Sequence, residues 1–233
     1  MINLALYSDQ IIPENAAIDS RLVALMQGRG RRIGYIPSGP DPEQRFFLER
    51  KLYYERIGLD LCLFHDLDKD HGADETDALF GCDAIHLPGG HTAGFLKRLR
   101  RADMLYRLRD WAMAGGVLIG TSAGAILMTP TIAVDALFGD GRPEDVLDDD
   151  ALDLLPFEFF PHLNGKPSYL PDLLRYSIKA PRPIIACNDG DGVVVANGRL
   201  EFIGNPLWIA SGEMKEARHI VPSLLPSKSD TVG

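Results

Sequence analysis

The sequence has few cysteines, fewer basic than acidic residues, and no long apolar run. Its three cysteines, Cys62, Cys82 and Cys187, lack metal-ligand spacing, so we expect buried free thiols and no metal. With 24 Lys and Arg against 33 Asp and Glu, the formal net charge is −9, which disfavours nucleic acid and anionic membrane surfaces as partners. No apolar run reaches the roughly 20 residues that cross a bilayer, and the N-terminus does not resemble a signal peptide. We therefore expect a cytoplasmic protein.

Short apolar runs instead alternate with longer amphipathic stretches. Strands are predicted at residues 2–7, 32–37, 60–64, 84–87, 117–119, 184–187 and 192–195, and helices at 45–57 and 92–115. This alternation predicts an α/β fold with a mostly parallel sheet covered on both faces, and the turn at Asn197-Gly198 predicts a hairpin that finishes the sheet. We expect a single domain over residues 1–221 and a flexible tail at 222–233.

The segment GTSAG at residues 120–124 follows a predicted strand and precedes a predicted helix. Such a strand–turn–helix elbow forces its central residue, here Ser122, into a strained backbone conformation, and it needs small neighbours such as Gly120 and Gly124. The unpaired amides at the start of the helix favour developing negative charge on the serine oxygen. We therefore predict that Ser122 is a nucleophile, rather than a simple helix cap.

A glycine pair, Gly89-Gly90, ends another predicted strand and is followed by His91 and Thr92. Glycines at a strand end expose backbone amides to a ligand. In an acyl-transfer site they would form an oxyanion hole, in which the amide of Gly90 acts together with that of Ala123. We expect Gly89, His91 and Thr92 to face the substrate. A phosphate loop is not expected, because the lysine and spacing of such loops are missing.

A serine nucleophile needs a general base, usually a histidine that a carboxylate orients. His162 is the favoured candidate, because it follows a short apolar run that ends in a proline and predicts a strand. His65, His71 and His219 lie in polar stretches and are expected at the surface, whereas His86 is expected to be a hydrogen-bonded strand residue. The carboxylate is sought in the acidic loop 138–150 and its approach, which offer Asp135, Asp140, Glu144 and Asp145.

In these motifs the sequence resembles the dipeptidase E and cyanophycinase family of serine peptidases, which share a fold with class I glutamine amidotransferases. The resemblance covers roughly residues 2–205 and rests on LPGGHT (87–92), GTSAGA (120–125), PTI (130–132), ALDL (151–154) and PH (161–162). It implies a flavodoxin-like three-layer α/β/α sandwich, no cofactor, and a monomer or homodimer. It also places Ser122 and His162 on the nucleophile and base of a triad, and Gly90 and Ala123 on the oxyanion-hole amides.

The acidic member of the triad is less clear, because the chain departs from the family between the two anchors. Counting back from His162 leads to Asp140, which we prefer, whereas counting forward from Ser122 leads to Leu137, with Asp135 nearby as second choice. The resemblance places Asp189 on an acidic position in the next strand-end loop, where it could bind a substrate amine or cap a turn.

The segment after the histidine also departs from the family. The aspartyl-dipeptidase branch carries there an arginine that reads the substrate's N-terminal aspartate, whereas this chain has Ser168-Tyr169-Leu170, and Arg175 is expected on the next helix.

We therefore predict a serine hydrolase that cleaves a small peptide or amide through an acyl-enzyme. The alternatives are a non-catalytic ligand-binding or regulatory domain of the same fold, and a small-molecule esterase. A glutamine amidotransferase is disfavoured because that chemistry uses a cysteine at the position of Ser122.

Overall fold

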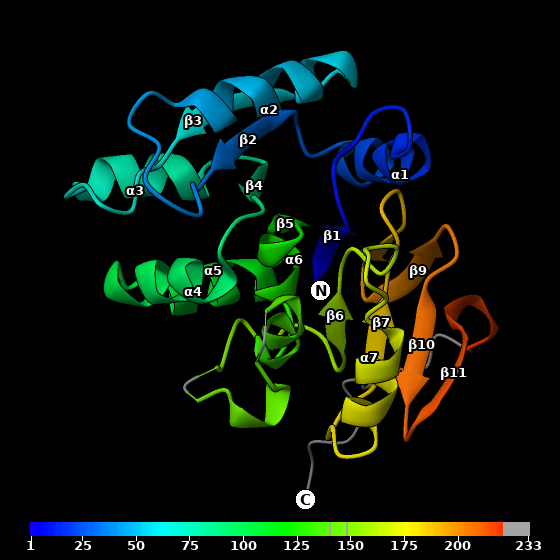
Figure 1. Cartoon of the computed structure of the whole chain (residues 1–233). Helices are drawn as coiled ribbons and strands as arrows, with labels where there is room; N and C mark the ends of the chain where they lie inside the picture. The colour runs from blue at the N-terminus through cyan, green and yellow to red at the C-terminus, as the bar shows by residue number, and fades with distance from the viewer. Residues whose placement is uncertain (140, 148, 221–233) are drawn as a thin grey trace, which may run out of the picture.

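The larger of two sheets forms the centre of the molecule (Figure 1) in the computed structural model, which describes residues 1–139, 141–147 and 149–220. Its seven strands lie in the order β3-β2-β4-β5-β1-β8-β9. The first five in this order are parallel to one another, and β8 is antiparallel to both of its neighbours, β1 and β9. The strands are β1 (Asn3–Tyr7), β2 (Arg32–Tyr35), β3 (Asp60–Phe64), β4 (Ala84–Leu87), β5 (Val117–Thr121), β8 (Gly192–Ala196) and β9 (Arg199–Ile203). The mostly parallel sheet and the hairpin at Asn197-Gly198 are confirmed.

The second sheet has four strands in the order β11-β10-β7-β6. It contains β6 (Glu158–Phe160), β7 (Ile184–Ala186), β10 (Leu207–Ala210) and β11 (Glu213–Glu216). Strands β6 and β7 are parallel, and β10 is antiparallel to both of its neighbours. The sequence analysis predicted one sheet, because an apolar run shows that a strand is buried but does not show which strand it pairs with.

Helices cover one face of the large sheet, and helices together with the small sheet cover the other. On the first face, α1 (Ala16–Met26) and α2 (Arg45–Arg56) share an apolar core with the sheet. On the second face, one core joins α4 (Thr92–Arg101), α5 (Met104–Met113) and α6 (Ala123–Ile126) to the small sheet. The three-layer arrangement is confirmed, with a second sheet in part of one outer layer.

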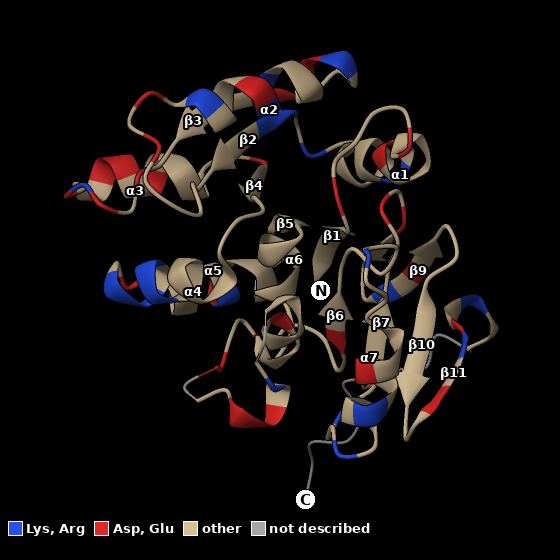
Figure 2. Cartoon of the chain, viewed as in Figure 1, with Lys and Arg blue, Asp and Glu red and all other residues tan. Residues whose placement is uncertain are grey.

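The predicted helix over 92–115 is two helices, because Asp103 between α4 and α5 has a left-handed backbone with φ of 54°. The remaining elements are α3 (Ala73–Phe80), α7 (Leu170–Ser177) and three 3₁₀ turns, η1 (Ala133–Phe138), η2 (Pro143–Asp145) and η3 (Ala217–His219). Figure 2 shows acidic residues on α3 and basic ones on α4. Among the described residues, no helix is both long and apolar enough to cross a membrane. The predicted tail, 222–233, lies outside the described residues.

Two of the cysteines are buried, as expected, but Cys62 is exposed. It lies on β3 at the edge of the large sheet, where one side of the strand is open to solvent. No disulfide links the three thiols, which are free.

The register of the central strands brings three loops to the same edge of the large sheet. Leu87 of β4 lies opposite Gly120 of β5, and Tyr7 of β1 lies opposite Thr121. The residues that follow these parallel strands therefore lie next to one another at the carboxyl edge, where ligands of open α/β sheets bind. This edge carries the candidate site.

Candidate active site

Ser122 occupies a strained turn between β5 and α6. Its φ of 49° and ψ of −110° are rare for a residue with a side chain, and its N–H donates to the Tyr7 carbonyl at 3.0 Å. A Cβ on Gly124 would collide with the Leu87 carbonyl oxygen, and one on Gly120 would lie 2.7 Å from the Ala125 backbone. The elbow therefore needs glycine at both positions. The helix that follows, α6, has only four residues, so its dipole is weaker than the sequence analysis assumed.

His162 lies next to the Ser122 hydroxyl. It follows β6 with a φ of 56°, and its N–H donates to Ser8 Oγ at 2.8 Å. Nε2 of His162 lies 2.9 Å from Ser122 Oγ, and Nδ1 lies 2.7 Å from Asp189 Oδ1. An ionised carboxylate only accepts hydrogen bonds, so Nδ1 carries the proton. In the neutral imidazole, Nε2 is then the acceptor for the Ser122 hydroxyl.

Among the described residues, the carboxylate that contacts His162 is that of Asp189. Asp189 follows β7, in which Ala186 pairs with Phe160 of β6. The N–H of Asp189 donates to Asn164 Oδ1 at 3.0 Å. The preferred candidate, Asp140, lies outside the described residues. The second choice, Asp135, accepts a 2.5 Å hydrogen bond from Thr92 Oγ1 instead. From the sequence, Asp189 is expected to bind a substrate amine or to cap a turn.

Two backbone amides near Ser122 have no partner in the described part of the chain. The N–H groups of Gly90 and Ala123, predicted to form the oxyanion hole, donate to no protein atom there. Gly89 packs against the nucleophile, since a Cβ on it would lie 3.4 Å from Ser122 Cβ. Unpaired amides beside a nucleophile can stabilise negative charge on a substrate oxygen.

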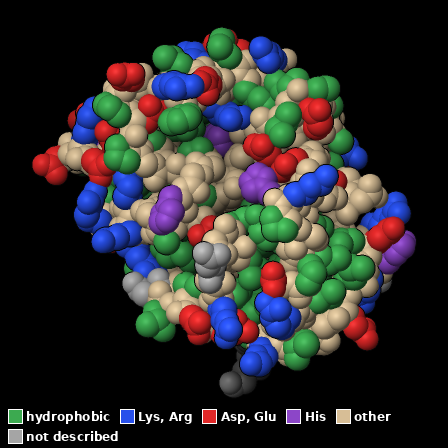
Figure 3. All heavy atoms as spheres, viewed as in Figure 1, with side chains coloured by type: hydrophobic (Ala, Val, Ile, Leu, Met, Phe, Trp, Pro, Cys, Tyr) green, Lys and Arg blue, Asp and Glu red, His purple; other side chains and the backbone are tan. Residues whose placement is uncertain are grey.

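A cavity of about 520 Å³ opens beside Ser122. On the face drawn in Figure 3, histidine side chains border a recess of mostly uncharged surface. Neither Lys nor Arg is among the described residues that line the cavity; the lining residues are Gly90, His91, Thr92, Ser122, Asp135, Ala136, Phe138, Gly139, Gly141 and His162. Burial raises the pKa of the Asp135 carboxyl above its usual value. Asp135 supplies the one carboxyl group among the described residues that line the cavity.

His91 and Thr92, which the sequence predicts to face the substrate, border the cavity, and both also have structural roles. His91 Nδ1 accepts from the Gly94 N–H at 2.9 Å and so caps α4, while Thr92 donates to Asp135. Arg175 pairs with Asp172 on α7 and does not line the cavity.

An aromatic wall beside the base was not predicted from the sequence. The Phe138 ring stacks on Phe160 at 4.7 Å and meets the edges of His162 and Tyr169. Tyr169 stands in the segment where the aspartyl-dipeptidase branch has its arginine, so an aromatic contact is present in this chain. The apolar pair Leu137-Phe138 ahead of an acidic loop is the signal that could have indicated this wall.

The other histidines differ in their surroundings. His65 is buried and stacks on His71 at 3.8 Å, so the surface position predicted for it is wrong, while His219 is exposed. Burial lowers the pKa of His65 to about 4. His86 Nε2 lies 3.2 Å from Thr121 Oγ1, which fits its predicted strand role.

One group of described residues could hold a metal ion. Ligand atoms of Asp9, His162 and Asp189 lie within 4.8 Å of one another. Both ring nitrogens of His162 already contact protein atoms, Nδ1 with Asp189 and Nε2 with Ser122. A metal ion bound there would compete with these two contacts.

Comparison with known proteins places the chain in a family. The model of Peptidase family S51 matches residues 4–203. An uncharacterized peptidase of Listeria monocytogenes serovar 1/2a is 29% identical over 174 residues, which cover 72% of this chain and 80% of that protein. Peptidase E of Salmonella typhimurium strain LT2 is 30% identical over 149 residues, which cover 59% of this chain and 62% of that protein.

Two solved structures share the fold. A Listeria monocytogenes EGD-e protein, provisionally described as a peptidase E, has a TM-score of 0.67 at 22% identity and covers 87% of this chain and 98% of its own. A peptidase from an acI-B1 Actinobacterium has a TM-score of 0.61 at 15% identity, with coverages of 93% and 97%. Taken with the family match over residues 4–203, these similarities show that the chain belongs to Peptidase family S51 and is a serine-type peptidase of the dipeptidase E type.

Proposed function

We propose that the chain hydrolyses small peptides through a triad of Ser122, His162 and Asp189. The observation that carries the proposal is the position of the His162 ring, which bridges Ser122 Oγ at 2.9 Å and Asp189 Oδ1 at 2.7 Å. This arrangement supplies a nucleophile, a base and an orienting carboxylate in one line of hydrogen bonds. Asp189 takes the role that the sequence analysis gave to Asp140.

The chemistry follows from these contacts. His162 Nε2 takes the proton of Ser122 Oγ as that oxygen attacks the substrate carbonyl carbon, and the amides of Gly90 and Ala123 donate to the resulting oxyanion. The imidazolium then gives its proton to the leaving amine as the C–N bond breaks. Water, deprotonated by His162, attacks the acyl-enzyme ester, and the imidazolium then returns the proton to Ser122 Oγ as the C–O bond breaks and the acid is released. Asp189 keeps the Nδ1–H tautomer and stabilises the imidazolium throughout.

The acidic lining suggests which peptides fit the cavity. Asp135 is half-buried, lines the cavity and has one hydrogen-bond donor, Thr92. A substrate ammonium group, either a free N-terminus or a basic side chain, would pair with this carboxylate, whereas a substrate aspartate would be repelled by it. We therefore assign Asp135 to substrate binding and expect a preference for cationic over Asp-X peptides.

A fluorophosphonate reagent tests the proposed triad, because it reacts with activated serines. Intact-mass measurement should show one adduct on the wild type and none on Ser122→Ala, with labelling of His162→Ala slowed by at least about a thousandfold. Labelling of the wild type at the rate of His162→Ala would contradict the triad and favour the ligand-binding alternative.

A dipeptide library then tests the proposed substrate class. Peptides with a free, cationic N-terminal residue should be cleaved faster than their acetylated forms or Asp-X peptides, and Asp135→Asn should remove most of this difference by raising KM. Equal rates for acetylated and free peptides in the wild type would disprove the role assigned to Asp135.

A further inference from the structure

Ser38 packs directly onto the glycine pair that borders the nucleophile. It lies in the loop after β2, and its Oγ donates to the Gly89 carbonyl oxygen at 2.7 Å. A Cβ on Gly90 would overlap the Ser38 side chain. The Ser38 hydroxyl and the Gly89–Gly90 peptide group are therefore in close contact.

The geometry of the peptide bond connects this contact to the oxyanion hole. In a planar trans peptide, the carbonyl of Gly89 and the N–H of Gly90 point in opposite directions. Holding the carbonyl toward Ser38 therefore turns the Gly90 N–H away from Ser38, and this N–H has no protein partner among the described residues. Gly90 lines the Ser122 cavity, so the free N–H is available there.

The peptide group between two glycines needs a hydrogen bond of this kind to fix its orientation. Gly90 has a φ of 149°, a region that residues with side chains rarely enter, and glycine crosses between φ regions with little steric penalty. Rotation of the Gly89–Gly90 peptide plane would exchange the positions of its N–H and C=O. The oxyanion position would then face a carbonyl oxygen, which repels negative charge.

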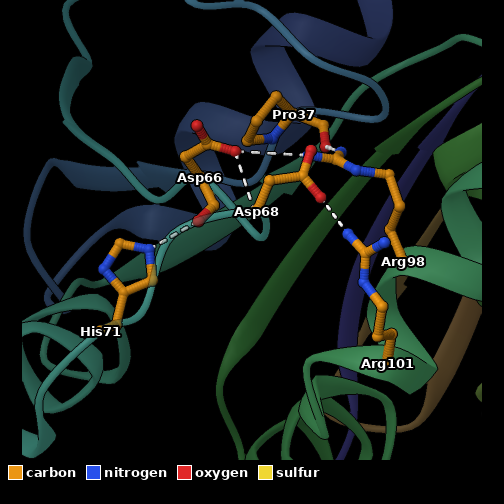
Figure 4. A network of polar contacts seen from close by, with 6 residues as sticks. All are labelled: Pro37, Asp66, Asp68, His71, Arg98 and Arg101. Atoms are coloured by element: carbon orange, nitrogen blue, oxygen red, sulfur yellow. Dashed lines mark hydrogen bonds and ion pairs between the residues drawn. The ribbon is translucent and has the colours of Figure 1, made fainter.

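Arg98 in turn fixes the loop that carries Ser38. Figure 4 shows the Arg98 guanidinium between Pro37 and two aspartates. Its Nη1 donates to the Pro37 carbonyl at 2.5 Å, and its Nη2 donates to Asp68 Oδ2 at 2.9 Å and to Asp66 Oδ1 at 3.3 Å. Arg98 is 9% exposed and belongs to α4, which begins two residues after Gly90. One buried side chain thus ties together the loops that follow β2 and β3 and the helix that follows the glycine pair.

We propose that Ser38 is a positioning residue of the oxyanion hole: its hydroxyl holds the Gly89–Gly90 peptide so that the Gly90 N–H faces the oxygen of the tetrahedral intermediate. Arg98 supports this role by fixing Pro37. The inference rests on the proposed acyl-enzyme function of Ser122. It assigns a catalytic consequence to a side chain that contacts neither substrate nor triad.

The test compares Ser38→Ala with Ser38→Thr, which keeps the hydroxyl, and with Ser20→Ala, the same change at an exposed position on α1. The substrate is p-nitrophenyl acetate, and the active sites are counted by fluorophosphonate labelling. Removing one oxyanion donor lowers kcat by roughly 10² to 10³. A Gly90 N–H that is still present but no longer held in position should therefore lower kcat by a smaller factor, about tenfold. We expect Ser38→Ala to lower kcat per active site by about tenfold, with KM within about twofold of the wild type.

A tetrahedral inhibitor separates positioning from general damage. Phenylboronic acid forms a tetrahedral adduct with an active serine, and its Ki does not depend on the fraction of folded enzyme. Ser38→Ala should raise this Ki by about the factor by which kcat falls, while Ser38→Thr and Ser20→Ala should match the wild type in both constants. Arg98→Lys should, like Ser38→Ala, lower kcat and raise Ki, but by smaller factors.

The possible outcomes distinguish the two proposals. A wild type that neither labels nor hydrolyses the ester would overturn the proposed function and this inference together. An active wild type with unchanged kcat and Ki in Ser38→Ala would overturn only the inference. A lowered kcat with an unchanged Ki, or with no recovery in Ser38→Thr, would also overturn it, because the defect would then lie outside the oxyanion hole.

Discussion

The two sheets end in loops that reach the same cavity, but they supply different parts of the site. The seven-stranded sheet carries Ser122 and the free amides of Gly90 and Ala123, whereas the parallel pair β6 and β7 of the four-stranded sheet carries His162 and Asp189. In the proposed mechanism, the first half supplies the nucleophile and stabilises charge on the substrate, and the second half moves the proton. Their separation means that variants can damage one half and leave the other intact.

The largest expected effect comes from breaking the half that belongs to the small sheet. Asp189→Asn replaces the acceptor of the Nδ1 proton with a group that can also donate, which favours the wrong tautomer of His162. We expect kcat to fall by about 10⁴, as is typical when a triad carboxylate becomes an amide. Steady-state kinetics on the best library peptide measures the loss.

The matched control for that variant is Asp140→Asn, which tests the carboxylate preferred from the sequence. Its kcat should stay within about twofold of the wild type. A large loss of kcat in Asp140→Asn, with little change in Asp189→Asn, would show that Asp140 and not Asp189 is the third member of the triad.

A smaller effect is expected from distorting the half that belongs to the large sheet. Gly124→Ala places a methyl group against the Leu87 carbonyl oxygen, so α6 must move and Ser122 moves with it. We expect activity to fall by about a hundredfold, because displacements of about 1 Å have effects of that size. The control is Gly39→Ala, whose added methyl group meets no atom within 4 Å and should change little. Wild-type activity in Gly124→Ala would show that the elbow tolerates rearrangement.

Ser8 connects the two halves and should have an intermediate effect. It follows β1 of the large sheet, accepts the His162 N–H at 2.8 Å, and lies 3.2 Å from both Asp189 Oδ1 and the Cys187 carbonyl. Ser8→Ala leaves the triad residues present but less firmly placed, so kcat should fall by about tenfold with little change in KM. An unchanged kcat would mean that packing alone aligns the two halves.

The smallest expected effect concerns stability rather than catalysis. Glu158 of β6 is 1% exposed and accepts from the Tyr176 hydroxyl at 2.9 Å, and burial raises its pKa to about 7. The folded protein therefore holds this proton more tightly than the unfolded chain, and stability falls as the pH rises from about 4.5 through about 7.

Glu158→Gln removes this ionisation, so its Tm should match the wild type near pH 5 and exceed it by roughly 5 °C near pH 8. Thermal unfolding of both proteins across this range measures the difference. A constant Tm difference at all pH values would contradict the raised pKa.

The sequence predicted the large sheet well, because each element carries its own signal. Strands β1 to β5 are short apolar runs, and the glycines around Ser122 reflect a local steric need that the structure explains. The position of His162 after β6 was also predicted from local features, namely an apolar run that ends in Pro161.

The partners of these elements could not be predicted in the same way. Asp189 meets His162 because β7 pairs with β6, a contact between segments that are 27 residues apart and that no local pattern specifies. The same reason explains why the second sheet was missed. The contact between Ser38 and Gly89 likewise joins loops that are 51 residues apart, so only the folded chain reveals it.

The placement of the proposed triad on two sheets also predicts how the enzyme responds to heat. The hydrogen bond between Ser122 and His162 joins the sheets, and a change of about 1 Å in their separation is enough to break it. Such a change leaves every strand paired within its own sheet, so circular dichroism would not detect it. Thermal inactivation is therefore expected to begin below the temperature at which secondary structure melts.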